Sequence, residues 1–92
     1  MGLNRVLLLG EVVRIGWTPA SWRADAIVDL TVRVTHECRD TRGTALTACD
    51  VQVEVPASLV SGVSTGRSIA IEGRLRLSDK GYVVVAERVV TP

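Results

Sequence analysis

The feature that most constrains this chain is a long apolar stretch near its start, residues 3–15, with a single glycine near the middle. The stretch is rich in leucine and β-branched residues, which indicates a strand. A glycine inside a strand packs nothing, and it marks a bulge or a sharp bend such as a barrel corner. A strand bent at Gly10 can pair on both sides of the bend and help a small antiparallel sheet close on itself. We therefore expect residues 3–15 to be the first strand of a small closed barrel.

Two further strands are predicted by period-two alternation, over residues 26–36 and 46–55. Alternation of this kind is typical of strands with one buried and one wet face. The segment between them, residues 37–44, is polar and contains a glycine, so it predicts a hairpin loop. The positions expected to face the core are Leu30, Val32, Val34, Val51, Val53 and Val55.

The second half of the chain predicts a short helix and two more strands. Pro56 ends the third strand because it cannot donate to a ladder, and residues 57–63 have room for one or two helical turns. A fourth strand is expected over residues 67–77 and a fifth over residues 82–90, joined by a tight turn at 78–81. In the fourth strand, the residues expected to face inward are Ile69, Ile71, Leu75 and Leu77.

Five strands with a helix between the third and fourth predict one all-β domain over residues 1–92. This is the element order of the OB-fold, a five-stranded Greek-key barrel that binds oligonucleotides and oligosaccharides. Periodicity alone would also allow a small SH3-like barrel. The position of the helix favours the OB-fold.

Composition narrows the classes of function. The net charge of +1 argues against a general polyanion binder but leaves room for a local basic patch. The start of the chain does not resemble a signal peptide, and no apolar run reaches the roughly 20 residues that span a bilayer. We therefore expect a cytoplasmic protein with no membrane contact.

No catalytic or metal-binding motif stands out in the sequence. A structural zinc ion needs four ligands, and His36, Cys38 and Cys49 supply three, without a Cys-x-x-Cys spacing. The chain also has no glycine-rich phosphate loop and no nucleophile motif. We expect neither an enzyme nor a cofactor.

Three segments carry a resemblance to a known family. They are Leu3-Asn4-Arg5-Val6-Leu7-Leu8-Leu9-Gly10, then Thr18-Pro19 in the first loop, and Ile71-Glu72-Gly73-Arg74-Leu75 in the fourth strand. Together they resemble the bacterial single-stranded DNA-binding proteins and a shorter member, primosomal replication protein N (PriB). The resemblance implies an OB-fold, a homodimer or homotetramer, and sequence-tolerant binding of single-stranded DNA.

The chain departs from this family where the family's aromatic side chains stack on bases. Stacking is worth about 1 to 3 kcal/mol per base. Cys38 stands where the family often has an aromatic residue, and the aromatic position of the third strand falls on Ala48 or Cys49, depending on a one-residue shift in alignment. Alternation favours Ala48. That phase places Asp50 and Glu54 on the outer face, where their carboxylates would repel phosphates.

Two family features are missing or reduced in this sequence. Because the sequence ends at Pro92, we expect no long flexible tail with an acidic tip like that of the longer members, and we expect a short turn between the last two strands. Both differences make the chain more similar to PriB. The resemblance then implies replication or primosome proteins as partners.

Nine residues are predicted to contact DNA. The cations, on the outer faces of strands and in hairpin loops, would form a groove along the backbone, where each neutralised phosphate adds salt-dependent affinity. The aromatic residues, beside the connections, would stack on bases or anchor a partner. The nine are Arg33, Arg39, Arg42, Arg74, Arg76, Lys80, Trp17, Trp22 and Tyr82.

Each of these predictions has a structural alternative. Arg74 and Arg76 would form ordinary surface ion pairs, for example with Glu72, Asp29 or Glu87. The tryptophans would cap the open end of the barrel.

Two hypotheses from different classes follow. The first is a small homo-oligomeric OB-fold that binds single-stranded DNA in replication, repair or replication restart. The second is a protein-interaction adaptor that kept the barrel and lost nucleic-acid binding. The near-neutral charge and the missing aromatic residues support the second, and a salt series separates the two.

Overall fold

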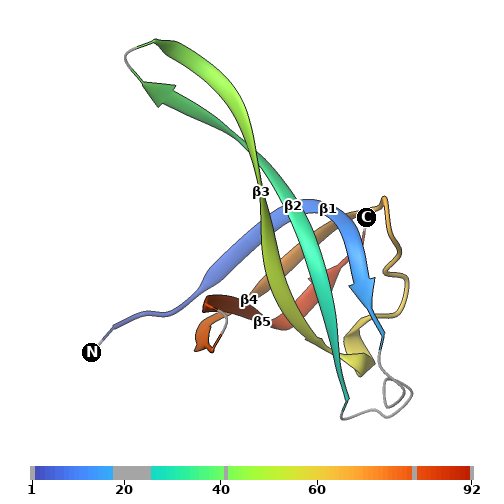
Figure 1. Cartoon of the computed structure of the whole chain (residues 1–92). Helices are drawn as coiled ribbons and strands as arrows, with labels where there is room; N and C mark the ends of the chain where they lie inside the picture. Colours follow the sequence, from blue (N-terminus) through green and yellow to red (C-terminus); the bar gives the residue numbers. More distant parts are fainter. Residues whose placement is uncertain (1, 18–25, 41, 80, 92) are drawn as a thin grey trace.

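A computed structural model describes residues 2–17, 26–40, 42–79 and 81–91, with the side chains of 37–40 outside this description. Its strands are β1 (Val6–Gly16), β2 (Ile27–Asp40), β3 (Gly43–Pro56), β4 (Ser68–Ser78) and β5 (Gly81–Val90), and a 3₁₀ turn, η1 (Ala57–Leu59), follows β3. The strands close into a barrel in the order β1-β2-β3-β5-β4 (Figure 1). The predicted all-β class and the five-stranded OB-fold order are confirmed.

The core consists of aliphatic side chains contributed by all five strands. Every buried residue in the described part of the chain is apolar, and Leu30 on β2 has no exposed surface. The predicted alternation holds in this part of β2 and β3, since Val28, Val32, Val53 and Val55 are also buried. Branched aliphatic side chains suit a pleated surface, so a chain without phenylalanine still fills a core of this size. The full set is Val12, Val28, Leu30, Val32, Val53, Val55, Ile69, Ile71, Val84 and Ala86.

Strand β1 changes partner at its middle, as the position of Gly10 predicts. Its first half pairs with β4 from Val6 to Glu11, and its second half pairs with β2 from Glu11 to Gly16. A Cβ atom at Gly10 would lie 2.5 Å from the carbonyl oxygen of Arg33, so only glycine allows β2 to approach this closely. The strong curve of β1 is visible in Figure 1.

The segment before β1 is held to β4 by the side chain of Asn4, which makes two hydrogen bonds to the Leu75 backbone as a neighbouring strand would. The Nδ2 group of Asn4 donates to the carbonyl of Leu75 (2.7 Å), and its Oδ1 atom accepts from the Leu75 amide (2.8 Å). The next residue, Arg5, forms an ion pair with Glu72 at 2.7 Å. The two residues Asn4-Arg5, which carry part of the family resemblance, thus hold β4 in place.

The hairpin of β2 and β3 is longer than predicted. All 14 residues of β2 pair with β3 in unbroken register, from Ile27↔Pro56 to Asp40↔Gly43. The expectation of a loop over residues 37–44 was therefore wrong. The pairing of β2 with β1 ends at Arg33, so residues 37–44 lie beyond the core. These residues therefore carry no alternation of apolar and polar side chains that would have predicted a strand. Beyond Arg33 the two strands leave the barrel as a two-stranded ribbon (Figure 1), which we call the β2–β3 ribbon: residues 34–40 and 43–49.

Two smaller expectations also need correction. The predicted helix over residues 57–63 is limited to η1, because the amides of Val60 and Val63 bond to carbonyls three residues back. Leu75 and Leu77 lie on the inward-facing side of β4 but are exposed. Strand β1 pairs with β4 only as far as Gly73, so the end of the β4–β5 hairpin extends past the core.

Candidate nucleic-acid interface

The outer face of β2 and β3 carries three consecutive polar rungs, which we call the polar ladder. Each rung joins one residue of β2 to its cross-strand partner on β3, and the middle rung holds a side-chain hydrogen bond of 3.3 Å. Alternation places these residues outside because the intervening valines and leucine fill the core. The rungs are Asp29–Glu54, Thr31–Gln52 and Arg33–Asp50.

The Arg33–Asp50 rung is a bidentate ion pair. Nε of Arg33 donates to Oδ1 of Asp50 at 2.9 Å, and the NH2 nitrogen donates to Oδ2 at 3.2 Å. The hydrogen bond and the positive charge of Arg33 hold the pKa of Asp50 below its ordinary value, and Asp50 raises the pKa of Arg33. Both side chains are about half exposed, so solvent screens the pair.

Two further arginines beside the ladder are also paired. The guanidinium of Arg76 on β4 contacts the carboxylate of Glu54 on β3. Arg74, two residues earlier, pairs with Glu87 of β5 at 3.2 Å. The outer face of β3 was expected to repel phosphates through Asp50 and Glu54. In the structure both carboxylates bond to arginines, Asp50 to Arg33 and Glu54 to Arg76.

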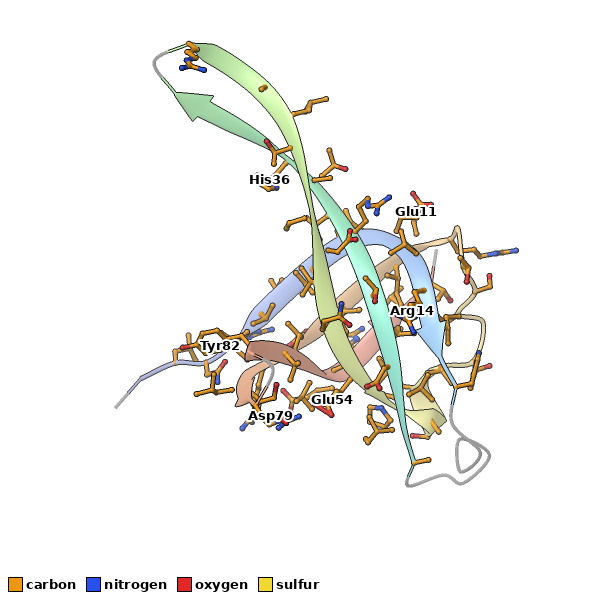
Figure 2. The ribbon with its side chains drawn as sticks, viewed as in Figure 1. Glu11, Arg14, His36, Glu54, Asp79 and Tyr82 are labelled. Carbon is orange, nitrogen blue, oxygen red and sulfur yellow. The ribbon has the colours of Figure 1, made fainter. Side chains whose placement is uncertain are left out.

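A hollow of about 470 Å³ lies between one end of the ladder and the β4–β5 hairpin. Tyr82 borders it with 68% of its surface exposed, and Arg14 enters it from β1. Figure 2 shows Tyr82 and Asp79 at the β4–β5 hairpin and Glu54 facing them from β3. An exposed phenol ring beside amide, hydroxyl and guanidinium groups can stack on one flat ring and bond to its polar edge.

Comparison with known proteins supports a fold assignment. No family model matches the sequence, and no curated protein matches it. Among solved structures, a deletion mutant of the single-stranded DNA-binding protein from Thermus aquaticus is 25% identical, with a TM-score of 0.75 over 99% of this chain and 51% of that one. The chain therefore spans about half the length of the Thermus protein.

Two other solved structures match over nearly their full length. A Plasmodium falciparum SSB in complex with single-stranded DNA is 14% identical over 100% of this chain and 96% of that one, with a TM-score of 0.71. The dimeric N-terminal domain of PriB from Thermoanaerobacter tencongensis is 18% identical over 97% and 96%, with a TM-score of 0.57. The fold is that of the single-stranded DNA-binding proteins. This confirms the structural resemblance to SSB and PriB expected from the sequence. The Thermus protein is named as a single-stranded DNA-binding protein, and the Plasmodium SSB is in complex with single-stranded DNA.

The structure brings only some of the nine predicted residues to one side of this SSB-like fold. Arg33 and Arg76 belong to the polar ladder or its edge, and Tyr82 borders the hollow. Trp17 exposes 58% of its surface just after β1, so it does not cap the core as the alternative reading suggested. Arg74 pairs with Glu87 and does not line the hollow. A surface ion pair with Glu87 was one of the structural alternatives expected for Arg74 from the sequence.

The remaining predicted residues are placed only in part. Arg42 lies exposed between β2 and β3, and Arg39 belongs to β2 with its side chain outside the description. Lys80 and Trp22 lie outside the described residues, as does the Thr18-Pro19 segment. The DNA contacts predicted for all nine residues stay predictions.

Sequence reasoning missed the arginines that have no carboxylate partner. Among the described residues, Arg14, Arg67 and Arg88 form no ion pair, and Arg14 is the one that lines the hollow. The prediction of the first strand rested on its apolar residues, so Arg14 was not assigned to an outward-facing position. Since Thr31 is opposite Arg14 in the register, this arginine adjoins the middle rung.

Neither a metal cluster nor a membrane helix is found in the described part of the chain. No group of three or more His, Cys, Asp or Glu side chains there could hold a metal ion. Its one helical segment, η1, is far too short to cross a bilayer.

Proposed function

We propose that this protein binds single-stranded DNA with little sequence preference and acts in replication, repair or replication restart. The observation that carries the proposal is the polar ladder on β2 and β3, which leads into a hollow bordered by exposed Tyr82. This is the face on which OB-folds bind oligonucleotides. The solved structures similar to this chain include one in complex with single-stranded DNA. The same role places the protein in the cytoplasm, with replication or primosome proteins among its partners.

The test is fluorescence anisotropy with a labelled oligo-dT of about 30 nucleotides, a length that covers two or more OB sites. We expect saturable binding that weakens as salt rises, because phosphate contacts release counterions. A double-stranded probe of the same length should bind less tightly, since its bases are not free to stack.

A matched pair of arginine variants locates the interface. Arg14→Ala removes an unpaired cation from the hollow, and Arg67→Ala removes an exposed, unpaired cation that lies outside it and outside the apolar hollow of β1, β4 and β5, with the same change in net charge. We expect Arg14→Ala to weaken binding several-fold more than Arg67→Ala does, and Tyr82→Ala to weaken it as well. A flat anisotropy trace from folded protein at low salt would overturn the proposal and favour the adaptor hypothesis.

We also propose that the chain forms homo-oligomers through the outer face of β1, β4 and β5. On this face Leu7 and Leu9 expose 70% and 69% of their surfaces, and Val90 is also exposed. They border a hollow of about 360 Å³ lined mostly by apolar residues. Exposed apolar patches of this kind mark interaction sites.

The backbone beside this patch points to a second copy as the occupant. Along residues 6–10, β1 pairs with β4 on one edge, and no described strand pairs with its other edge. An uncharged, unpaired edge is a template for another strand. With a two-fold axis beside β1, residues 6–10 of one copy would pair with residues 6–10 of the other, so the free edge of each copy would be hydrogen-bonded.

Sedimentation equilibrium tests this surface. Leu7→Glu with Leu9→Glu should convert an oligomer into a monomer. Leu46→Glu, which changes a leucine of similar exposure on the β2–β3 ribbon, should leave the assembly unchanged. A wild-type monomer at tens of micromolar, or dissociation caused by Leu46→Glu alone, would contradict this interface.

A further inference from the structure

Two arginines of the candidate interface, unlike Arg14, are already bonded to carboxylates of the same chain. Arg33 is held by Asp50 through two hydrogen bonds, and Arg76 is held by Glu54. Both carboxylates are on β3, and both point to the outer face with the polar ladder. A phosphate that approaches this face therefore meets, at Arg33, a guanidinium whose Nε and one terminal nitrogen already bond to Asp50, and, at Arg76, one whose terminal nitrogen already contacts Glu54.

We propose that Asp50 and Glu54 restrain these two arginines, so that single-stranded DNA binds the polar ladder by partner exchange. In this exchange each guanidinium leaves its carboxylate and takes up a phosphate. The inference rests on the proposed binding of single-stranded DNA and adds how that binding is limited. Asp50 and Glu54 are thus determinants of affinity although they repel the ligand.

Exchange is chemically reasonable because carboxylate and phosphate present the same geometry to arginine. The planar fork of a guanidinium bonds to either group through two parallel N–H donors. Asp50 competes as part of the same chain, at a high effective concentration and without the cost of association. The pair is also half exposed, so the guanidinium can turn toward solvent without leaving a buried charge behind.

Partner exchange has a distinct signature in the salt dependence. A cation that meets a phosphate releases counterions from the strand, which gives a slope of about −0.7 per contact in log K against log salt for single strands. When the cation comes from an internal ion pair, the bare carboxylate gains counterions as the phosphate loses them. Arg33 and Arg76 then contribute little to the slope, whereas unpaired Arg14 contributes in full.

The experiment neutralises the two restraining carboxylates and compares a control of equal charge. The first variant combines Asp50→Asn with Glu54→Gln. The control combines Asp29→Asn with Asp79→Asn, which also line the hollow or its ladder but hold no arginine in the described structure. Both variants raise the formal net charge by two. Binding of labelled oligo-dT is measured by anisotropy from about 25 to about 300 mM salt.

We expect the Asp50→Asn, Glu54→Gln variant to bind about tenfold more tightly than wild type near 0.1 M salt. Its slope should be steeper by about 1.4, which corresponds to two additional phosphate contacts. The control should change affinity less and leave the slope close to that of wild type. Circular dichroism and thermal melts establish that each variant is folded.

The possible outcomes separate the two proposals. If wild type binds and the two variants gain equally, net charge explains the gain and the restraint is overturned. If wild type binds and the first variant gains nothing, the restraint is overturned while the proposed function stands. If neither wild type nor the first variant binds, both proposals fail.

A spectroscopic readout observes the exchange itself. The Nε–H group of Arg33 donates to Asp50 in the free protein, so its ¹H–¹⁵N resonance should shift when oligo-dT is added. The same resonance should already be shifted in Asp50→Asn. An Arg33 resonance that stays fixed at saturating DNA would show that the ion pair remains closed and would overturn partner exchange.

Discussion

The two halves of the β2–β3 hairpin share one register but differ in what surrounds them. In the barrel half, alternate side chains such as Leu30 and Val53 are fully enclosed by β1, β4 and β5. In the β2–β3 ribbon, the same pairing continues with no third strand. Val34 at its base is half-buried against the core, whereas residues 35, 36 and 43–49 are exposed. Since both halves have the same backbone pairing, the core is what distinguishes them. The core under one half stabilises the fold, while the other half is held only by its own ladder.

The largest expected difference between the two halves lies in hydrogen exchange. Barrel amides such as those of Val28 and Val55 should exchange only through global unfolding, and ribbon amides through local opening. We expect roughly a thousand-fold slower exchange in the barrel half. Measurement by NMR on the protein without DNA decides the point. Equal protection of the ribbon would mean that another molecule, for example a second copy, covers it.

Two leucine substitutions test the same contrast in stability. Leu30→Ala removes a fully buried side chain and should lower the free energy of unfolding by about 2 to 5 kcal/mol. Leu46→Ala makes the same chemical change at a ribbon side chain that is 75% exposed, and should cost less than about 0.5 kcal/mol. Urea denaturation of both variants gives the two values. Similar losses would show that the ribbon packs against something in solution.

The Asn4 side chain offers a smaller test at the β4–β5 hairpin, whose end also extends past the core. Asn4→Ala removes two hydrogen bonds to the backbone of Leu75 and should cost about 1 to 2 kcal/mol. Asn4→Asp keeps the acceptor for the Leu75 amide but sets a carboxylate oxygen against the Leu75 carbonyl in place of the donor, so we expect a loss at least as large as that of Asn4→Ala. The measurement is again urea denaturation. A variant as stable as wild type would show that the polar side chain does not hold β4.

The smallest expected effect lies at the junction of the two halves, where Arg33 ends the pairing with β1 and bonds to Asp50. Arg33 holds the pKa of Asp50 below its ordinary value, so the folded state favours the carboxylate. The stability from this pair is present above the unfolded pKa of about 3.9 and is lost as the pH falls through that value toward the folded pKa.

Thermal melts between about pH 6 and about pH 3 measure this effect. We expect Asp50→Asn to melt slightly below wild type at pH 6 and to lie closer to it at pH 3. Its melting temperature should also depend less on pH. A constant difference across the range would mean that the Asp50 charge contributes nothing through its pKa.

The sequence was sufficient for the part of the fold that has a core. Alternating valines and leucines located the barrel halves of β2 and β3, and Gly10 located the bend of β1, because burial imposes a pattern on the sequence. The ribbon could not be found in this way, since strands without a core carry no such pattern. Leu75 and Leu77 were assigned to the correct face, but only the pairing of β1 with β4 shows that this face runs past the core.

The outward placement of the candidate interface residues was predictable, but their ion pairs were not. Outward positions of β2, β3 and β4 followed from alternation and include Arg33 and Arg76, whose contacts with DNA stay a prediction. Their partners, Asp50 and Glu54, lie 17 and 22 residues away in the chain, and pairing them requires the register between strands. Tyr82 was proposed because the sequence has three aromatic residues and all of them lie at or beside connections. The hollow beside Tyr82 became visible only in the structure.

The unbroken register of β2 and β3 makes the ribbon an arm of adjustable length. No bulge lies anywhere along its pairing, so residues added in matched pairs at the tip would leave every side chain of the barrel on its present face. Each two residues added to both strands would extend the arm by about 7 Å. A chain of this kind can therefore change the length of this arm through insertions that leave the packing of the core unchanged.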